Sequence, residues 1–113
     1  MQLTEKVRKA LENISDVQEK KMFSGIAFMV NEKLCITVKN NRIMCRIDPA
    51  LHDELVEQPG CTTMIMKGRE YKGYIVVDEA VLQSKKQLDY WIKLALDFNP
   101  KAKATIKKTP KKS

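Results

Sequence analysis

The feature that most limits the fold of this sequence is a series of short apolar runs separated by turn residues. The runs are rich in β-branched, aromatic and Met side chains, which is typical of β-strands. Gly25, Asn31 and Asn40-Asn41 separate the first four runs as turns. The pattern predicts six strands, of which the first four form a meander, at residues 17–23, 26–30, 34–38, 42–47, 62–67 and 71–77.

Three segments have the pattern of helices. Apolar residues recur at spacings of three and four over residues 3–14, which predicts an amphipathic helix with one buried stripe. Asp48 can cap a second helix that starts at Pro49, where the missing N–H of proline costs nothing. Ser84 begins a capping box for a third helix over residues 85–98.

The order α-β-β-β-β-α-β-β-α predicts an α+β fold, with helices packed on one face of a mainly antiparallel sheet. A chain of 113 residues can bury one core without disulfide or metal staples. We expect one domain over residues 1–99. Residues 100–113 are rich in Lys and have a single apolar side chain besides Ala and Pro, Ile106, so we expect a disordered tail.

The net charge of +7 belongs mainly to this tail. Six lysines and no acidic residue follow Pro100, so subtracting six from +7 leaves +1 for the first 100 residues. Such a tail can neutralise phosphates without reading bases. Weak, non-specific nucleic-acid binding is one interpretation, and a solubilising terminus is the other, which the nearly neutral domain favours. The lysines concerned are Lys101, Lys103, Lys107, Lys108, Lys111 and Lys112.

Composition also bears on the compartment. Three cysteines, an odd number, fit a reducing cytoplasm better than an oxidising compartment. No stretch approaches the ~20 apolar residues that a membrane span needs. Residues 1–6 have no apolar run that could act as a secretory signal. We expect a cytoplasmic protein without membrane contact.

The Asn40-Asn41 pair predicts a two-residue hairpin, because Asn tolerates left-handed conformations. The resulting register pairs Val38 with Ile43, Ile36 with Cys45 and Leu34 with Ile47. Because strand side chains alternate between faces, Cys45 should point into the core. Cys35 should then lie on the other face, opposite Arg46.

The face of the sheet away from the core should be partly apolar instead of charged. The residues expected there are Ala27, Met29, Cys35, Thr37 and Met44. Methionine surfaces suit adaptable contacts. Either a helix covers this face, or it forms an interface with a second copy or with a protein partner.

Few residues have a pattern that indicates chemistry. Cys35 near Arg46 could have a lowered thiol pKa, although a buried and inert cysteine is the simpler interpretation. His52 lies beside acidic residues in the sequence, and we expect it to be solvated. No Gly-rich phosphate-binding motif occurs, and no cysteine pair has zinc-ligand spacing. We therefore expect no catalytic residues, no metal and no cofactor.

Four short motifs carry a resemblance to a known family. They are Met-Phe-Ser-Gly at residues 22–25, Arg-Ile-Asp at 46–48, a Gly-containing hairpin at 66–74, and a closing helix with Trp91 in its middle. Together they resemble the amino-terminal domain of the TfoX/Sxy family. The likeness runs from about residue 7 to residue 98.

The resemblance implies a stand-alone domain of this type, without the helical carboxy-terminal domain of full-length family members. Some members regulate bacterial competence genes, so the resemblance implies regulation through protein contacts. Ser24 stands where the family shows the first of two glycines, and a serine fits there if its φ is negative.

The sequence thus predicts a small non-catalytic binding module that acts through protein contacts. Its partner can be a second copy of the chain, as in a homodimer, or another protein, which the sequence does not identify. The alternative is a small-molecule-binding protein or a small enzyme that uses a cleft between the sheet and a helix. Cys35, Arg46, Tyr71 and Tyr74 are the polar residues that such a cleft would use.

Overall fold

A computed structural model describes residues 2–22 and 24–102 of the chain. Its elements follow the predicted order, which confirms the α+β fold. The helices are α1 (Leu3–Ala10), α2 (His52–Leu55) and α3 (Lys85–Phe98), and the 3-10 turns are η1 (Pro49–Leu51), η2 (Glu79–Val81) and η3 (Asn99–Lys101). The strands are β1 (Val17–Met22), β2 (Gly25–Val30), β3 (Lys33–Lys39), β4 (Arg42–Arg46), β5 (Cys61–Met66) and β6 (Arg69–Asp78).

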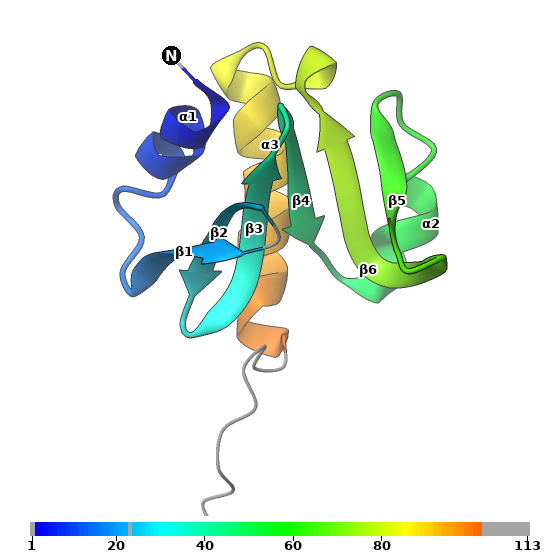
Figure 1. Cartoon of the computed structure of the whole chain (residues 1–113), viewed down its shortest axis with the longest axis horizontal. Helices are drawn as coiled ribbons and strands as arrows, with labels where there is room; N and C mark the ends of the chain where they lie inside the picture. The colour runs from blue at the N-terminus through cyan, green and yellow to red at the C-terminus, as the bar shows by residue number, and fades with distance from the viewer. Residues whose placement is uncertain (1, 23, 103–113) are drawn as a thin grey trace, which may run out of the picture.

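The six strands form one antiparallel sheet in the order β1-β2-β3-β4-β6-β5. The chain leaves β4 through α2, passes to the edge as β5, and returns as β6 between β4 and β5. Helix α3 lies behind β3 and β4 in Figure 1, and α1 packs beside it. The main core lies between these helices and the sheet, and Val7, Phe28, Ile36, Ile75 and Trp91 are among its members.

Local signals explain where the helices begin. In the capping box of α3, the Ser84 hydroxyl accepts the N–H of Gln87 at 3.1 Å, and the Gln87 side chain accepts the N–H of Ser84 at 3.0 Å. The Asp48 carboxylate accepts the N–H of Ala50 at 2.9 Å and so caps η1. Helix α1 ends at Ala10, earlier than the expected residue 14, and α2 is a single short turn.

Two-residue turns set the register of the meander. Asn40 and Asn41 have φ values of 50° and 62°, as the predicted left-handed turn requires, and Val38 pairs with Ile43. Ser24 has a φ of 63°. The condition under which a serine fits easily, a negative φ, is therefore not met, and a serine occupies a left-handed position where the family shows glycine.

A β-bulge in β3 changes which side chains share a face. Phe28 pairs with Ile36, but Met29 pairs with Leu34, so Cys35 is the extra residue. Cys35 lies in the main core together with Cys45, whereas Leu34 joins Met29 on the opposite face. The predictions that Cys35 leaves the core face and that Leu34 stays on it are wrong, because simple alternation does not hold across a bulge.

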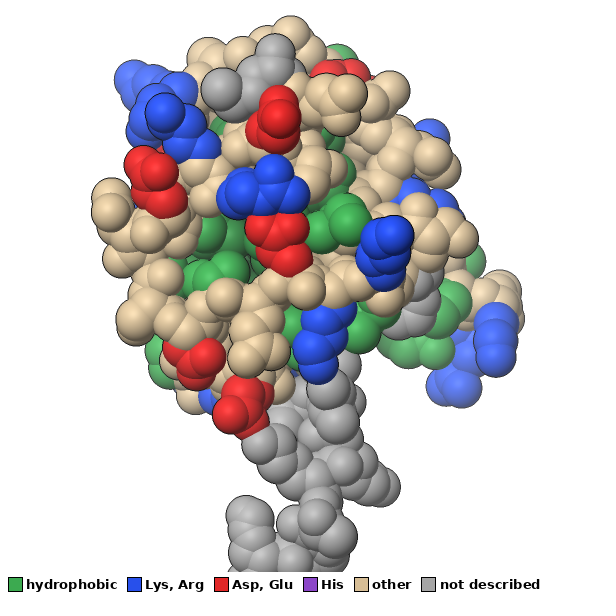
Figure 2. All heavy atoms as spheres, turned by 60° about the vertical axis from the view of Figure 1, so that its left-hand side comes forward, with side chains coloured by type: hydrophobic (Ala, Val, Ile, Leu, Met, Phe, Trp, Pro, Cys, Tyr) green, Lys and Arg blue, Asp and Glu red, His purple; other side chains and the backbone are tan. Residues whose placement is uncertain are grey.

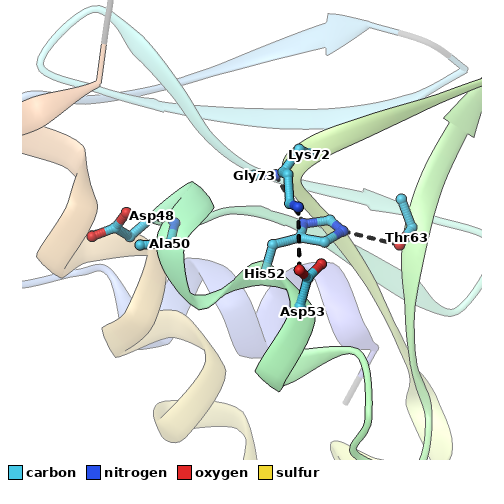
Figure 3. Close-up of polar contacts among 7 residues, drawn as sticks. All are labelled: Asp48, Ala50, His52, Asp53, Thr63, Lys72 and Gly73. Carbon is cyan, nitrogen blue, oxygen red and sulfur yellow. Dashed lines mark hydrogen bonds and ion pairs between the residues drawn. The ribbon is translucent and has the colours of Figure 1, made fainter.

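His52 is buried, with 3% of its surface exposed, so the expectation of a solvated histidine is wrong. Its ring lies between two segments of the sheet (Figure 3). The Nδ1 atom accepts the backbone N–H of Gly73 at 2.8 Å, and Nε2 lies 2.9 Å from the hydroxyl of Thr63. His52 therefore fastens α2 to both β5 and β6.

Gly73 occupies a second irregularity, where β6 shifts its register against β5. Its φ is +92°, and a Cβ there would lie 3.2 Å from Cγ of Pro49 and 3.3 Å from the carbonyl oxygen of Ile47. Ile47 is also bonded to Gly73, because the N–H of Ile47 donates to the Gly73 carbonyl at 2.8 Å. Only glycine meets both requirements, the positive φ and the close approach.

Replacing His52 with Ala should lower the free energy of unfolding by about 2–3 kcal/mol, because the buried N–H of Gly73 loses its acceptor and a cavity forms. His52→Asn should lower it less, since Oδ1 of Asn can accept the same N–H. Urea unfolding followed by circular dichroism measures both changes.

The matched control is Asp53→Ala in the same short helix. Asp53 forms an ion pair with Lys72 at 3.2 Å, but its side chain is 81% exposed. Loss of such a pair should cost less than about 1 kcal/mol. A His52→Ala variant no less stable than Asp53→Ala would contradict a fastening role for His52.

Candidate functional site

The face of the sheet opposite the described helices, here the second face, is apolar at its centre. Ala27, Met29, Leu34 and Met44 form a second core there, and none is more than 7% exposed. Met22, Met64, Tyr74 and Val76 pack against this cluster from both ends of the sheet. No helix among residues 2–22 and 24–102 covers it.

This burial changes what four of the predicted interface residues can do. Ala27, Met29, Thr37 and Met44 are 0%, 1%, 5% and 7% exposed, so they are interior residues of the second face. The fifth, Cys35, lies in the main core. An interface role for them stays a prediction, and accessible surface on this face must come from their neighbours.

A groove of about 590 Å³ runs over the second face between the β3-β4 hairpin and β5. Its wall and floor combine methionines with hydroxyl side chains. Among the lining residues are Ser24, Thr37, Met44, Thr62, Met64, Met66 and Val76. Thr37 and Met44, both predicted for this face, thus reach the groove, whereas Ala27 and Met29 do not line it.

Two cations line the same groove, Lys39 and Arg42. They flank the Asn40-Asn41 turn, pair with each other in the register, and are exposed. Neither forms an ion pair with a described residue. Sequence reasoning missed them, although the predicted hairpin already places both residues on the face of Thr37 and Met44.

The hydroxyl of Thr37 has no hydrogen-bond partner among the described residues, and its oxygen is buried. A buried hydroxyl without a partner costs about 1–3 kcal/mol. Thr37 lies between Ala27 on β2 and Met44 on β4, at the end of the groove near those strands. The Thr37 hydroxyl is therefore a polar group that could still form a hydrogen bond at this apolar end of the groove.

The cysteines have the chemistry of buried thiols. Burial raises the pKa of Cys35 to about 12, and the nearby Arg46 offsets this only in part. Burial also raises the pKa of Cys61 to about 11 and that of Cys45 well above its usual value. The alternative of a lowered pKa for the Cys35 thiol finds no support, because the thiol is protonated at neutral pH and inaccessible.

A second groove, of about 660 Å³, lies between α1 and α3. Leu88, Ile92 and Leu96 provide apolar lining, and lysines and acidic residues alternate along its sides. Figure 2 shows this side of the molecule, where hydrophobic side chains lie between charged ones of both signs. Two of the rim lysines are already paired within α3, Lys85 with Asp89 and Lys93 with Asp97.

Edge strand β5 is the third surface feature. β5 pairs only with β6 among the described strands, and its six residues carry no charge. Ile65 in β5 is 63% exposed. The opposite edge strand, β1, carries Glu19, Lys20 and Lys21. Charged edges prevent strand pairing between molecules, so β5 is the edge open to another chain.

The end of the described chain is anchored to the β2-β3 turn. The buried Asn99 side chain donates to the Val30 carbonyl at 3.0 Å and accepts from Asn31 at 2.9 Å. Lys101 follows in η3 and is exposed. The other predicted nucleic-acid contacts, Lys103, Lys107, Lys108, Lys111 and Lys112, lie outside the described residues, so that contact stays a prediction.

Within residues 2–22 and 24–102, no group of three or more His, Cys, Asp or Glu side chains could hold a metal ion. No helix in the same part of the chain is long and apolar enough to span a bilayer.

The raised pKa of Cys35 predicts a pH dependence of stability. Above about pH 9 the unfolded thiol ionises while the folded one stays protonated, so the unfolded state binds fewer protons and stability falls as pH rises. Cys35→Ala should remove up to about 1.4 kcal/mol per pH unit of this fall between about pH 9 and 11. Urea unfolding at several pH values measures it. Parallel curves for both proteins would contradict the burial of this thiol.

Comparison with known proteins supplies the family. A family model described as the TfoX N-terminal domain matches residues 9–99. No curated protein and no solved structure shows significant similarity to the chain. The matched region includes all six strands, α2 and α3, and thus the second face, its groove and the β5 edge. The chain therefore belongs to the TfoX N-terminal domain family.

Proposed function

We propose that this protein is a small non-catalytic binding module, which regulates through protein contacts made at edge strand β5. The observation that carries the proposal is the uncharged, exposed edge of β5 with Ile65 63% exposed. A free strand edge offers a row of backbone donors and acceptors to another chain. Because some members of the same family regulate competence genes, we propose that such contacts serve a regulatory role.

The first partner we propose is a second copy of the chain. Antiparallel pairing of β5 with β5 is symmetric about a two-fold axis, as a homodimer requires. The pairing brings no like charges together, because Cys61–Met66 contains none. It would also cover Ile65, and burying apolar surface contributes about 25 cal/mol per Å² before association costs.

Sedimentation equilibrium of the full chain tests the homodimer. Ile65→Lys should raise the dissociation constant about tenfold or more, because it removes apolar contact and places two like charges at the symmetric edge. Gln18→Lys is the matched control, since it adds the same charge to the exposed face of the opposite edge strand, β1.

The wild-type chain and Gln18→Lys should dimerise alike. A monomer at high micromolar concentration, or equal dimerisation of Ile65→Lys, would contradict pairing through β5. In that case affinity capture with the same two variants tests a different protein partner: a protein held by wild type and Gln18→Lys but lost with Ile65→Lys supports β5 as the contact. Equal recovery with all three would overturn the proposal.

A further inference from the structure

We propose that the groove on the second face binds a small organic anion with an apolar body, such as a medium-chain carboxylate. This site borders the edge contact of β5, because Ile65 also belongs to the groove lining, but its charged and polar contacts come from β3 and β4. Its volume of about 590 Å³ lies within the range of about 300–1,000 Å³ that small-molecule sites occupy.

The apolar body of the ligand is matched by the methionine lining. Met44 lies at the base of the groove and is 7% exposed, while Met64, Met66 and Val76 are half-buried along it. Methionine side chains are flexible and polarizable, so they adapt to chains of irregular shape. An alkyl chain laid over them would exclude water from side chains that are partly wet.

The charge of the ligand is matched by Lys39 and Arg42. The groove lining contains these two cations and no acidic residue. Asp78 faces Arg42 across the β4-β6 register, but it forms no ion pair with Arg42 and is not part of the lining. A carboxylate can take two parallel hydrogen bonds from a guanidinium group, which favours Arg42 as its main contact.

The uncharged polar end of the site is Thr37. Its hydroxyl has no partner in the described protein, and staggered rotamers about χ1 exchange the positions of hydroxyl and methyl. One rotamer change can therefore present the hydroxyl to a second oxygen of the ligand. Lys39 lies two residues along the same strand and on the same face, and both residues line the groove.

Methyl NMR of the full chain labelled at its methionines tests the site. Met44, Met64 and Met66 line the groove, whereas Met22 and Met29 do not. Sodium decanoate below its micelle concentration should shift the three groove methyls in a saturable manner. Acetate, which lacks the apolar body, and decyltrimethylammonium, which carries the opposite charge, should each bind about tenfold more weakly or worse.

Variants distinguish recognition of the ligand's charge from non-specific hydrophobic binding. Arg42→Gln and Lys39→Gln should each weaken decanoate binding by about 3- to 10-fold. Asp78→Asn should strengthen it about twofold, because the acidic residue that pairs with Arg42 in the β4-β6 register is gone. Lys86→Gln, an exposed change on α3 outside the groove, is the control and should bind as wild type. Thr37→Val should weaken binding about threefold without lowering the melting temperature, since the hydroxyl it removes has no partner.

The assignment would be overturned by an absence of saturable shifts at low millimolar decanoate or by shifts confined to Met22 and Met29. Binding of decyltrimethylammonium as tight as that of decanoate would also overturn it. Equal affinities of Arg42→Gln and Lys86→Gln would equally exclude the proposed anion contact. Sedimentation of the wild-type chain with and without decanoate separates ligand binding from dimerisation, because Ile65 lines the groove as well as the β5 edge and its replacement would alter both.

Discussion

The extra residue in β3 decides how both faces of the sheet are packed. Strand β2 alternates without interruption, so Phe28 and Val30 face the helices while Met29 faces away. The bulge at Cys35 brings Leu34 into step with Met29, and the second face becomes a closed cluster of apolar side chains. In the described part of the chain no helix lies on that side, and the groove and the β5 edge remain as accessible surface.

Much of this fold can be predicted from local sequence. The Ser84 capping box and the Asn40-Asn41 turn depend on residues close in the chain, and both form as expected. The bulge cannot be predicted in the same way. Two separate turns fix the two ends of β3, and the one-residue difference between their registers is taken up by the bulge within the strand. His52 escaped prediction for a similar reason, since its partners Thr63 and Gly73 follow 11 and 21 residues later.

Part of the candidate site can be predicted from the sequence. Once the hairpin is drawn, Lys39 and Arg42 fall on the face of Thr37 and Met44, so the cations at the groove follow from the alternation rule. What the sequence does not show is the burial of Met29 and Ala27 by the rest of the sheet. That burial leaves Met29 and Ala27 inaccessible, and the accessible part of this face is the groove lined by Thr37, Met44 and the residues of β5.

Nuclear Overhauser contacts of the Leu34 methyl groups test the central claim most directly, because Leu34 is the residue whose face depends on the bulge. The structure predicts contacts from Leu34 to the methyl of its cross-strand partner Met29, within the second core. Contacts from Leu34 to Ile47 in the main core would restore simple alternation. That result would contradict the bulge and the groove built on it.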